Sequence, residues 1–386
     1  MRINKKKFCV RIFILISIIG FLIYGRFLAT HDVERENLFG YYKDLIGGLK
    51  NNSSTYIMAE KINSISTDKT QKNIIIGINS GVLLVNSNGL KEYFTSNNPI
   101  WAEDFYITNP ILENAGNWTV VAEDNGNKII VFNSREEVYG LEIEGEIQKV
   151  FVNASGYVGV IFTKAGYKNA FSFINSKGEI IYTKYFANTT LIDADISSDG
   201  KKVFMLEADV NGAVVNSAIT ILDNKADTLN SLIKKNSLLV EVHCFDKDAL
   251  IVGDDTIISI DSDYKEAVFD DFDPESVIGL FVNDERVVKL YRDTNELFAN
   301  KTMLEIKNID GKIIGQTEVE GMAHSVKIQN NTVAVILTDR IDFLTQKGHY
   351  ISSIFISGDY KDMQLFSNGA YAAIQTNDGI SIYKIR

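Results

Sequence analysis

The sequence is poor in cysteine and proline, and each shortage excludes a class of protein. The only cysteines are Cys9 and Cys244, so a disulfide framework and a cysteine-rich zinc site are both excluded. Cys244 stands in an apolar run, and we interpret it as a small buried hydrophobic residue. Only three prolines occur, which excludes a proline-rich stalk or wall linker.

An excess of positive charge is also missing. The formal net charge is −11, whereas binding to phosphates needs clustered Lys and Arg, so a nucleic-acid partner is not expected. The composition, with 45% hydrophobic and 23% charged residues, is that of a globular protein. A chain of 386 residues is too long for one ordinary hydrophobic core unless it folds as a repeat or a barrel.

One long uncharged run occurs at 12–25, behind a basic N-terminal stretch. Extended to 8–28, the segment covers roughly 31 Å as a helix, about the thickness of a hydrocarbon core. We interpret 8–28 as a transmembrane signal anchor, 1–7 as a basic cytoplasmic tail, and the rest of the chain as exported. A cleaved signal peptide is the alternative, but cleavage after Ala29 would place Phe27 where a small residue is required.

The segment 29–52 is interpreted as a juxtamembrane spacer. It contains a short stripe of large apolar residues at helical spacing, which predicts one short helix. The stripe consists of Leu38, Tyr41, Tyr42 and Leu45, and Gly47 and Gly48 would end the helix. The alternative is a docking helix for a membrane partner.

From 53 to 386 one pattern recurs about every 40 residues, the spacing of propeller blades. Its clearest copy is 149–186, where four short alternating runs are separated by turns rich in Gly, Asn and Ser. Alternation with a period of two predicts strands, and such turns predict hairpins. A four-stranded sheet this small cannot bury both faces alone, so it needs neighbours like itself. The pattern therefore predicts an all-β propeller over 53–386.

The number of copies predicts eight four-stranded blades. The last copy, 357–386, holds only three strands, while 55–62 forms a strand without partners nearby in the sequence. We expect 55–62 to complete the last blade beside 379–386, because closing the ring removes exposed sheet edges. Seven blades remain possible if the short copy at 237–272 or the one at 320–355 is irregular.

The copies share a turn of the form S-x-(D/N)-G or a relative of it. The turns are Ser87-Asn88-Gly89, Ser176-Lys177-Gly178, Ser198-Asp199-Gly200, Ile309-Asp310-Gly311 and Ser367-Asn368-Gly369. With these turns, the basic N-terminus and the single apolar span, the chain resembles the DUF5711 family of bacterial membrane-anchored propellers. Its repeats are similar to degenerate WD40-like and quinoprotein-like repeats. The resemblance covers nearly the whole chain and implies fold and topology only.

Two features of better-known propellers are missing. The Trp-Asp dipeptide and the Gly-His pair of WD40 repeats do not occur, so their hydrogen-bonded tetrad is not expected. The chain has only Trp101 and Trp118, so it lacks the regular tryptophan pattern of quinone-dependent dehydrogenases. This argues against a redox enzyme.

Two acidic stretches resemble cation sites at first sight. Asp193, Asp195 and Asp199 resemble a calcium loop, but the required Glu does not follow, and a hairpin turn explains them better. A second stretch contains Asp270, Asp271, Asp273 and Glu275 and lies at a copy boundary. We interpret it as a solvated loop between blades, with a cation site as the alternative.

The histidines show no metal-ligand spacing and no partner for acyl transfer. They are His31, His243, His324 and His349. A propeller gathers distant loops around one axis, so sequence distance does not exclude a site. We nevertheless assign no catalytic, cofactor-binding or metal-binding residue, and expect no cofactor.

These patterns favour a membrane-tethered, extracytoplasmic propeller that acts as a non-catalytic scaffold. Its expected partner is another envelope protein or a cell-wall polymer, because rigid blades present many loops on one face. The alternative is an exported enzyme or small-ligand receptor with a polar site in the central channel. Carboxylates or histidines converging from several blades would favour the alternative.

Overall fold

The computed structural model describes residues 56–245, 248–283, 286–293, 301–356 and 359–386. The predicted tail (1–7), anchor (8–28) and spacer (29–52) lie outside these ranges, as does His31. None of the residues within the ranges forms a helix with the length and hydropathy of a membrane span.

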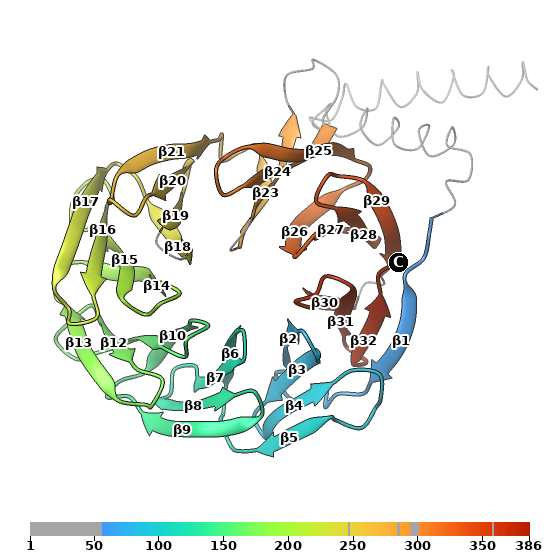
Figure 1. Ribbon diagram of the computed structural model, residues 1–386, viewed down its shortest axis with the longest axis horizontal. Coiled ribbons are helices and arrows are strands. Elements are labelled where there is room, and N and C mark those ends of the chain that lie inside the picture. Colours follow the sequence, from blue (N-terminus) through green and yellow to red (C-terminus); the bar gives the residue numbers. More distant parts are fainter. Residues whose placement is uncertain (1–55, 246–247, 284–285, 294–300, 357–358) are drawn as a thin grey trace, which may run out of the picture. The chain divides into compact units, whose positions relative to one another are not determined.

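The described residues form eight four-stranded antiparallel sheets, which are the blades of one ring (Figure 1). Blade 1 contains β2 (Ile74–Ile78), β3 (Gly81–Asn86), β4 (Gly89–Tyr93) and β5 (Trp101–Asp104). Blade 2 contains β6 (Pro110–Ala115), β7 (Trp118–Glu123), β8 (Lys128–Asn133) and β9 (Glu136–Glu142). Blade 3 contains β10 (Ile147–Val152), β11 (Val158–Phe162), β12 (Asn169–Ile174) and β13 (Ile180–Phe186). Blade 4 contains β14 (Thr190–Ile196), β15 (Lys202–Asp209), β16 (Asn216–Asp223) and β17 (Thr228–Lys235).

The second half of the ring repeats the same order. Blade 5 contains β18 (Leu239–Phe245), β19 (Asp248–Gly253), β20 (Thr256–Ile260) and β21 (Glu266–Asp271). Blade 6 contains β22 (Val277–Val282), β23 (Arg286–Asp293), β24 (Lys301–Asn308) and β25 (Ile313–Val319). Blade 7 contains β26 (Ala323–Gln329), β27 (Thr332–Leu337), β28 (Arg340–Thr345) and β29 (Tyr350–Phe355). Blade 8 contains β30 (Tyr360–Leu365), β31 (Tyr371–Thr376), β32 (Ile380–Lys384) and β1 (Glu60–Ile65). The prediction of eight four-stranded blades is confirmed.

The ring closes as predicted, with an N-terminal strand completing the last blade. β1 pairs antiparallel with β32, and Lys61 lies opposite Tyr383. The predicted boundaries, 55–62, are wrong, because residues 57–59 lie on the outer edge of blade 7 instead. There the Ser353 N–H donates to the Ile57 carbonyl at 2.8 Å, and the Ala59 N–H donates to the Ser353 carbonyl at 3.0 Å. We call residues 57–59 the strap.

The hydrophobic core lies between the blades rather than within any one of them. Eight buried clusters occur, and each joins side chains of two neighbouring blades around the ring. One example is the contact of Phe171 and Phe173 in blade 3 with Leu191 and Met205 in blade 4. Each sheet therefore buries both faces only because it has two neighbours, as the strand pattern predicted.

Candidate functional site

A polar cluster lies where the first strands of blades 2 to 5 meet near the centre of the ring. Figure 1 shows β6, β10, β14 and β18 on the inner side of their blades. We call the cluster the axial cluster; it consists of Glu113 on β6, Lys149 on β10, Asp193 and Asp195 on β14, and Glu241 and His243 on β18. Of the histidines in the described ranges, only His243 belongs to it.

Asp193 connects three blades through its two carboxylate oxygens. Lys149 Nζ of blade 3 donates to Oδ1 at 2.5 Å, and the Val242 N–H of blade 5 donates to Oδ2 at 2.9 Å. The Asp193 side chain is only 5% exposed. Burial raises its pKa, although the charge of Lys149 and its hydrogen bonds oppose that rise.

Asp195 makes a second connection between blades 4 and 5. Its Oδ2 accepts from the Cys244 N–H at 2.8 Å, and its Oδ1 accepts from the Ile196 N–H at 2.8 Å. Burial raises the pKa of Asp195 from its ordinary value of 3.8 to about 6, and the two backbone hydrogen bonds oppose the rise. Cys244 itself is buried, as expected, and burial raises the pKa of its thiol well above the ordinary value.

Glu113 differs from the two aspartates because its side chain makes no hydrogen bond or ion pair within the described ranges. Glu113 is exposed to solvent on the innermost strand of blade 2. Desolvation raises the pKa of Glu113 to about 7; Lys149 lowers it, and the charges of Asp195 and Asp193 raise it further. Four carboxyl groups thus share the cluster with one lysine and one histidine. His243 lies 3.3 Å from Glu241, and this contact lowers the pKa of Glu241.

The calcium-loop pattern is divided between a strand and a turn. Asp193 and Asp195 belong to β14, whereas Asp199 stabilises the following turn by accepting from the Lys201 N–H at 3.0 Å. Gly200 has a φ of +68°, and a Cβ there would lie 2.3 Å from the Tyr157 ring, so the turn requires glycine. Within the ranges that the structure describes, no group of three or more His, Cys, Asp or Glu side chains could hold a metal ion.

The acidic stretch near residue 270 contributes to an ion network rather than a solvated loop. Asp270, on β21 of blade 5, accepts from Lys289 and Lys307 of blade 6 at 2.6 and 2.8 Å. Glu305 lies 3.5 and 3.3 Å from the same two lysines, and all four side chains are 10–13% exposed. The predicted position between blades is right, but the prediction of a solvated loop is wrong for Asp270. Its neighbours do remain at the surface.

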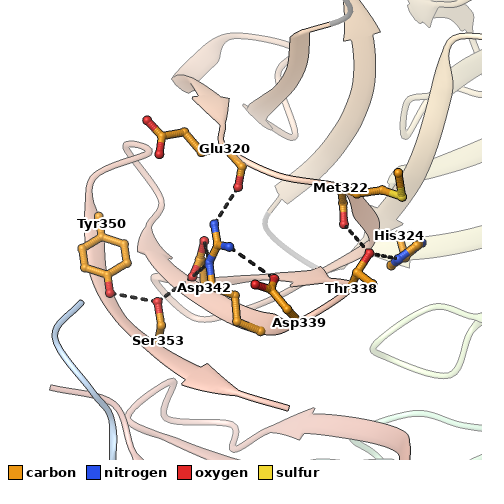
Figure 2. Close-up of polar contacts among 9 residues, drawn as sticks. Glu320, Met322, His324, Thr338, Asp339, Asp342, Tyr350 and Ser353 are labelled. Carbon is orange, nitrogen blue, oxygen red and sulfur yellow. Dashed lines mark hydrogen bonds and ion pairs between the residues drawn. The ribbon is translucent and has the colours of Figure 1, made fainter. Parts of the chain in front are cut away.

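Blade 7 contains a buried ion pair between Arg340 and Asp342, and neighbouring polar groups form hydrogen bonds with it (Figure 2). Arg340 Nε donates to both carboxylate oxygens of Asp342 at 3.0 Å, and Arg340 Nη2 donates to the Glu320 carbonyl at 2.6 Å. Ser353 Oγ donates to Asp342 at 2.5 Å and lies 2.8 Å from the Tyr350 hydroxyl. The network therefore ends beneath the strap, because Ser353 is the residue whose backbone binds it.

The two histidines of blade 7 take no part in that ion pair. His324 lies 2.7 Å from the Thr338 hydroxyl, at the periphery of Figure 2. His349 lies in the turn between β28 and β29, where its N–H donates to Thr345 Oγ1 at 3.2 Å. The structure thus places neither of them in the axial cluster with His243.

Sequence reasoning missed Arg340, Asp342 and Lys149. A signal was present for the first two, because residues two apart on a strand share a face and the sequence reads Arg-Ile-Asp. For Lys149 no such local signal existed, because its partner Asp193 is 44 residues away.

The fold and these contacts define an eight-bladed β-propeller whose inner strands are joined by polar contacts between blades. Within that class, the chain belongs to the DUF5711 family, described as a family of unknown function, whose model matches residues 52–385. A search of curated proteins finds no significant match.

Solved structures that share the fold include two from different proteins. BamB from Moraxella catarrhalis is 13% identical, with a TM-score of 0.51 over 84% of this chain and 97% of that one. The C-terminal WD40 domain of Sif2 is 14% identical, with a TM-score of 0.60 over 86% of this chain and all of that domain (100%). At such identities the likeness shows the fold alone.

Proposed function

We propose that the protein is a non-catalytic interaction scaffold, tethered to a membrane by residues 8–28, that presents its propeller outside the cell to another envelope protein or to cell-wall polymer. The observation that carries this proposal is the distribution of exposed apolar side chains. They are found on the outer strands of six consecutive blades: Val138 on β9, Ile180 on β13, Ile233 on β17, Val268 on β21, Ile313 on β25 and Phe355 on β29, all 42–70% exposed. A rim that carries an exposed apolar side chain on successive blades offers repeated apolar contact points to another macromolecule.

The polar contacts between blades also support the proposal that the protein is a scaffold. Asp193, Asp195 and Asp270 are each occupied in joining one blade to the next. Such contacts make the ring rigid, and a rigid ring is suited to holding surface side chains in fixed positions for a partner. The fold shared with BamB and a WD40 domain is consistent with this use.

The proposal is tested by photocrosslinking in intact cells. A photoreactive phenylalanine analogue at Ile233 should give one reproducible adduct with an envelope component, because this side chain is 70% exposed on the outer strand of blade 4. The matched control is the same analogue at Asp263, an exposed turn residue of blade 5. Equal labelling from both positions, or none from either, would contradict a rim-based scaffold.

The predicted orientation is tested separately. Asp263→Cys, in a Cys9→Ser background, should react with a membrane-impermeant maleimide added to intact cells. The remaining thiol of Cys244 is buried and should stay unlabelled. Labelling of the thiol introduced at Asp263 only after lysis would contradict an extracytoplasmic propeller.

A second candidate is a receptor for a small cationic ligand at the axial cluster. The convergence of carboxyl groups from three blades, with a lysine from a fourth, favours it, and Glu113 is the member that makes no hydrogen bond within the described residues. Titration calorimetry of the full-length chain in detergent, with spermidine as probe, should then show binding that Glu113→Gln weakens about tenfold. Glu179→Gln, on the rim, is the control, and the absence of heat with the wild type would exclude this candidate.

A further inference from the structure

Four Asn-Gly pairs occur in the chain, and such pairs deamidate more readily than other pairs that begin with asparagine. They are Asn88-Gly89, Asn125-Gly126, Asn211-Gly212 and Asn368-Gly369. In deamidation the backbone nitrogen of the second residue attacks the side chain of the asparagine. Glycine permits this attack because its backbone is flexible and it has no side chain in the way. The reaction needs no enzyme, so the structure around each pair decides whether it occurs.

Three of the four glycines belong to tight turns that hold their backbone. The N–H groups of Gly126 and Gly369 each donate to the carbonyl three residues earlier, at 3.0 and 2.7 Å. Gly89 closes a two-residue turn, where it pairs with Asn86 at the start of β4. A nitrogen that is held in a turn must first leave its hydrogen bond before it can attack. These three pairs therefore react only when the turn opens.

Gly212 lies in a longer and more open segment. The loop 210–215 joins β15 to β16 in blade 4, and residues 210–214 are all exposed. Among the described residues, no backbone carbonyl accepts from the Gly212 N–H. A Cβ added at Gly212 would have only the backbone of Val214 nearby, with the nearest atom at 3.6 Å. The nitrogen of Gly212 is therefore free to react, and the space around it is unobstructed.

The side chain of Asn211 contacts its neighbours through its nitrogen. Nδ2 donates to the Asn188 carbonyl and to Asp209 Oδ1, both at 2.9 Å, and both contacts are exposed to water. Surface hydrogen bonds of this kind hold a side chain weakly, because water can replace either partner. Asn188 lies between β13 and β14, so one of these contacts ties the loop 210–215 to the connection between blades 3 and 4.

We propose that Asn211 is a site of spontaneous deamidation, with water as the only co-reactant, and that the reaction releases the loop 210–215 from Asn188. The Gly212 nitrogen loses its proton to solvent and bonds to Cγ of Asn211. The bond from Cγ to Nδ2 breaks, and Nδ2 takes up a proton from solvent and leaves as ammonia. Water then opens the cyclic imide at either carbonyl, which gives aspartate or isoaspartate. Nothing is oxidised or reduced, and the chain gains one negative charge.

The release of the loop follows from the loss of a donor. A carboxylate cannot donate to the Asn188 carbonyl, and it repels the carboxylate of Asp209, to which Nδ2 donated before. The isoaspartate product also lengthens the backbone by a methylene group. Val210 and Val214, which are 55% and 51% exposed on the same loop, then lose their fixed position on blade 4. The modification thus alters one surface of the propeller, whatever that surface binds.

Incubation of the full-length chain in detergent, at mildly alkaline pH in water enriched in heavy oxygen, tests the proposal. Each converted asparagine takes up oxygen from water, so peptide mass spectrometry reports the rate at each of the four pairs. Asn211 should convert on the order of tenfold faster than the other three, because each of those must first open its turn. In the urea-unfolded chain, the control, the four rates should be similar. Similar rates in the folded chain, or no conversion of Asn211, would overturn the proposal.

Two variants separate the reaction from its effect on the loop. Gly212 has no positive φ, so Gly212→Ala is tolerated, and its methyl group should slow conversion of Asn211 while the other three pairs react as before. Asn211→Asp imitates a product, so elastase, which accepts small side chains, should cut within 210–215 several-fold faster than in the wild type. Asn368→Asp, the matched control, should be cut there at the wild-type rate. Unchanged conversion in Gly212→Ala would contradict the attack by this nitrogen, and unchanged cleavage in Asn211→Asp would contradict the release of the loop.

Discussion

Asp195 gives the propeller a response to pH at the level of a single residue. Its pKa is raised from 3.8 to about 6 by burial, so the folded chain binds this proton more tightly than the unfolded chain. The free energy of unfolding must therefore fall as pH rises from about 4 to about 6, and the lost stability stays lost above that range. The expected loss is on the order of 2 kcal/mol.

Asp195→Asn should remove this dependence, because an amide carries no charge. Its single oxygen can replace only one of the two carboxylate oxygens that accept from Cys244 and Ile196, so the variant also loses stability by an amount that does not depend on pH. The difference in unfolding free energy, variant minus wild type, should be about 2 kcal/mol more favourable to the variant at pH 8 than at pH 4, as measured by urea titration at both pH values. Asp199→Asn is the control, and the difference in unfolding free energy between this variant and the wild type should change with pH in the opposite direction. Desolvation opposes ionisation of Asp199, but hydrogen bonds led by the Lys201 N–H lower its pKa. A constant difference between Asp195→Asn and wild type across this range would show that Asp195 keeps an ordinary pKa.

The Arg340–Asp342 pair allows a test of what a buried ion pair contributes. Asp342→Ala leaves the Arg340 guanidinium buried without its main partner, so we expect a loss of about 3–5 kcal/mol in unfolding free energy. Asp339→Ala removes a contact to the same arginine, but the Asp339 side chain is 63% exposed, so the loss should stay below about 1 kcal/mol. The double variant Arg340→Met with Asp342→Leu should recover most of the stability. Equal losses from both single variants would contradict the role of burial.

At the scale of elements, the strap and β1 are consecutive segments that pair with different blades. β1 completes blade 8, whereas the strap binds blade 7 through Ser353. Ala59→Pro removes the hydrogen bond from the Ala59 N–H to the Ser353 carbonyl, so the strap is held by one hydrogen bond instead of two. Because a strap held by one bond opens more often, the Ser353 amide, which donates to the Ile57 carbonyl, should exchange with solvent at least tenfold faster in hydrogen-exchange measurements. Met58→Ala, which keeps the backbone intact, should leave that amide protected. Unchanged exchange in Ala59→Pro would mean that the strap does not shield β29.

The sequence predicted element type much better than element boundaries. Alternation over 149–186 was sufficient for four strands, because each run has one apolar face. The closing strand was placed several residues too early, because 55–62 alternates as well as β1 does. Only tertiary contacts decide that Ile57 faces Ser353 while Lys61 faces Tyr383.

The axial cluster was beyond prediction for a related reason. Asp193 and Asp195 share one face of a strand, and that much follows from a period of two. Each carboxylate also accepts from a backbone N–H that is 49 residues away, on β18 of the next blade. Hairpin turns fix the order of strands within a blade, but the register between blades depends on side-chain packing that the sequence pattern does not encode.

At the scale of the whole ring, the seam between blades 5 and 6 is held differently from the others. Among the described residues, its apolar cluster comprises six buried side chains, the smallest set of the eight, and includes Phe245 and Val282. The Asp270 ion network bridges the same two blades. A charged network replaces part of the apolar contact there. We therefore expect the loss of Asp270 to destabilise this seam more than the loss of any one side chain destabilises a neighbouring seam.

Asp270→Asn should therefore open the ring at this seam. The substitution leaves Lys289 and Lys307 with Glu305 as their remaining partner in the network, and an uncompensated charge at 10–13% exposure costs about 3 kcal/mol. Hydrogen exchange should speed up first in β21 and β22, while the seam between blades 3 and 4 stays protected. Asp271→Asn, one residue along the same strand but exposed, should leave exchange at both seams unchanged. If Asp270→Asn instead accelerates exchange uniformly around the ring, the propeller opens as a single cooperative unit and this seam has no special weakness.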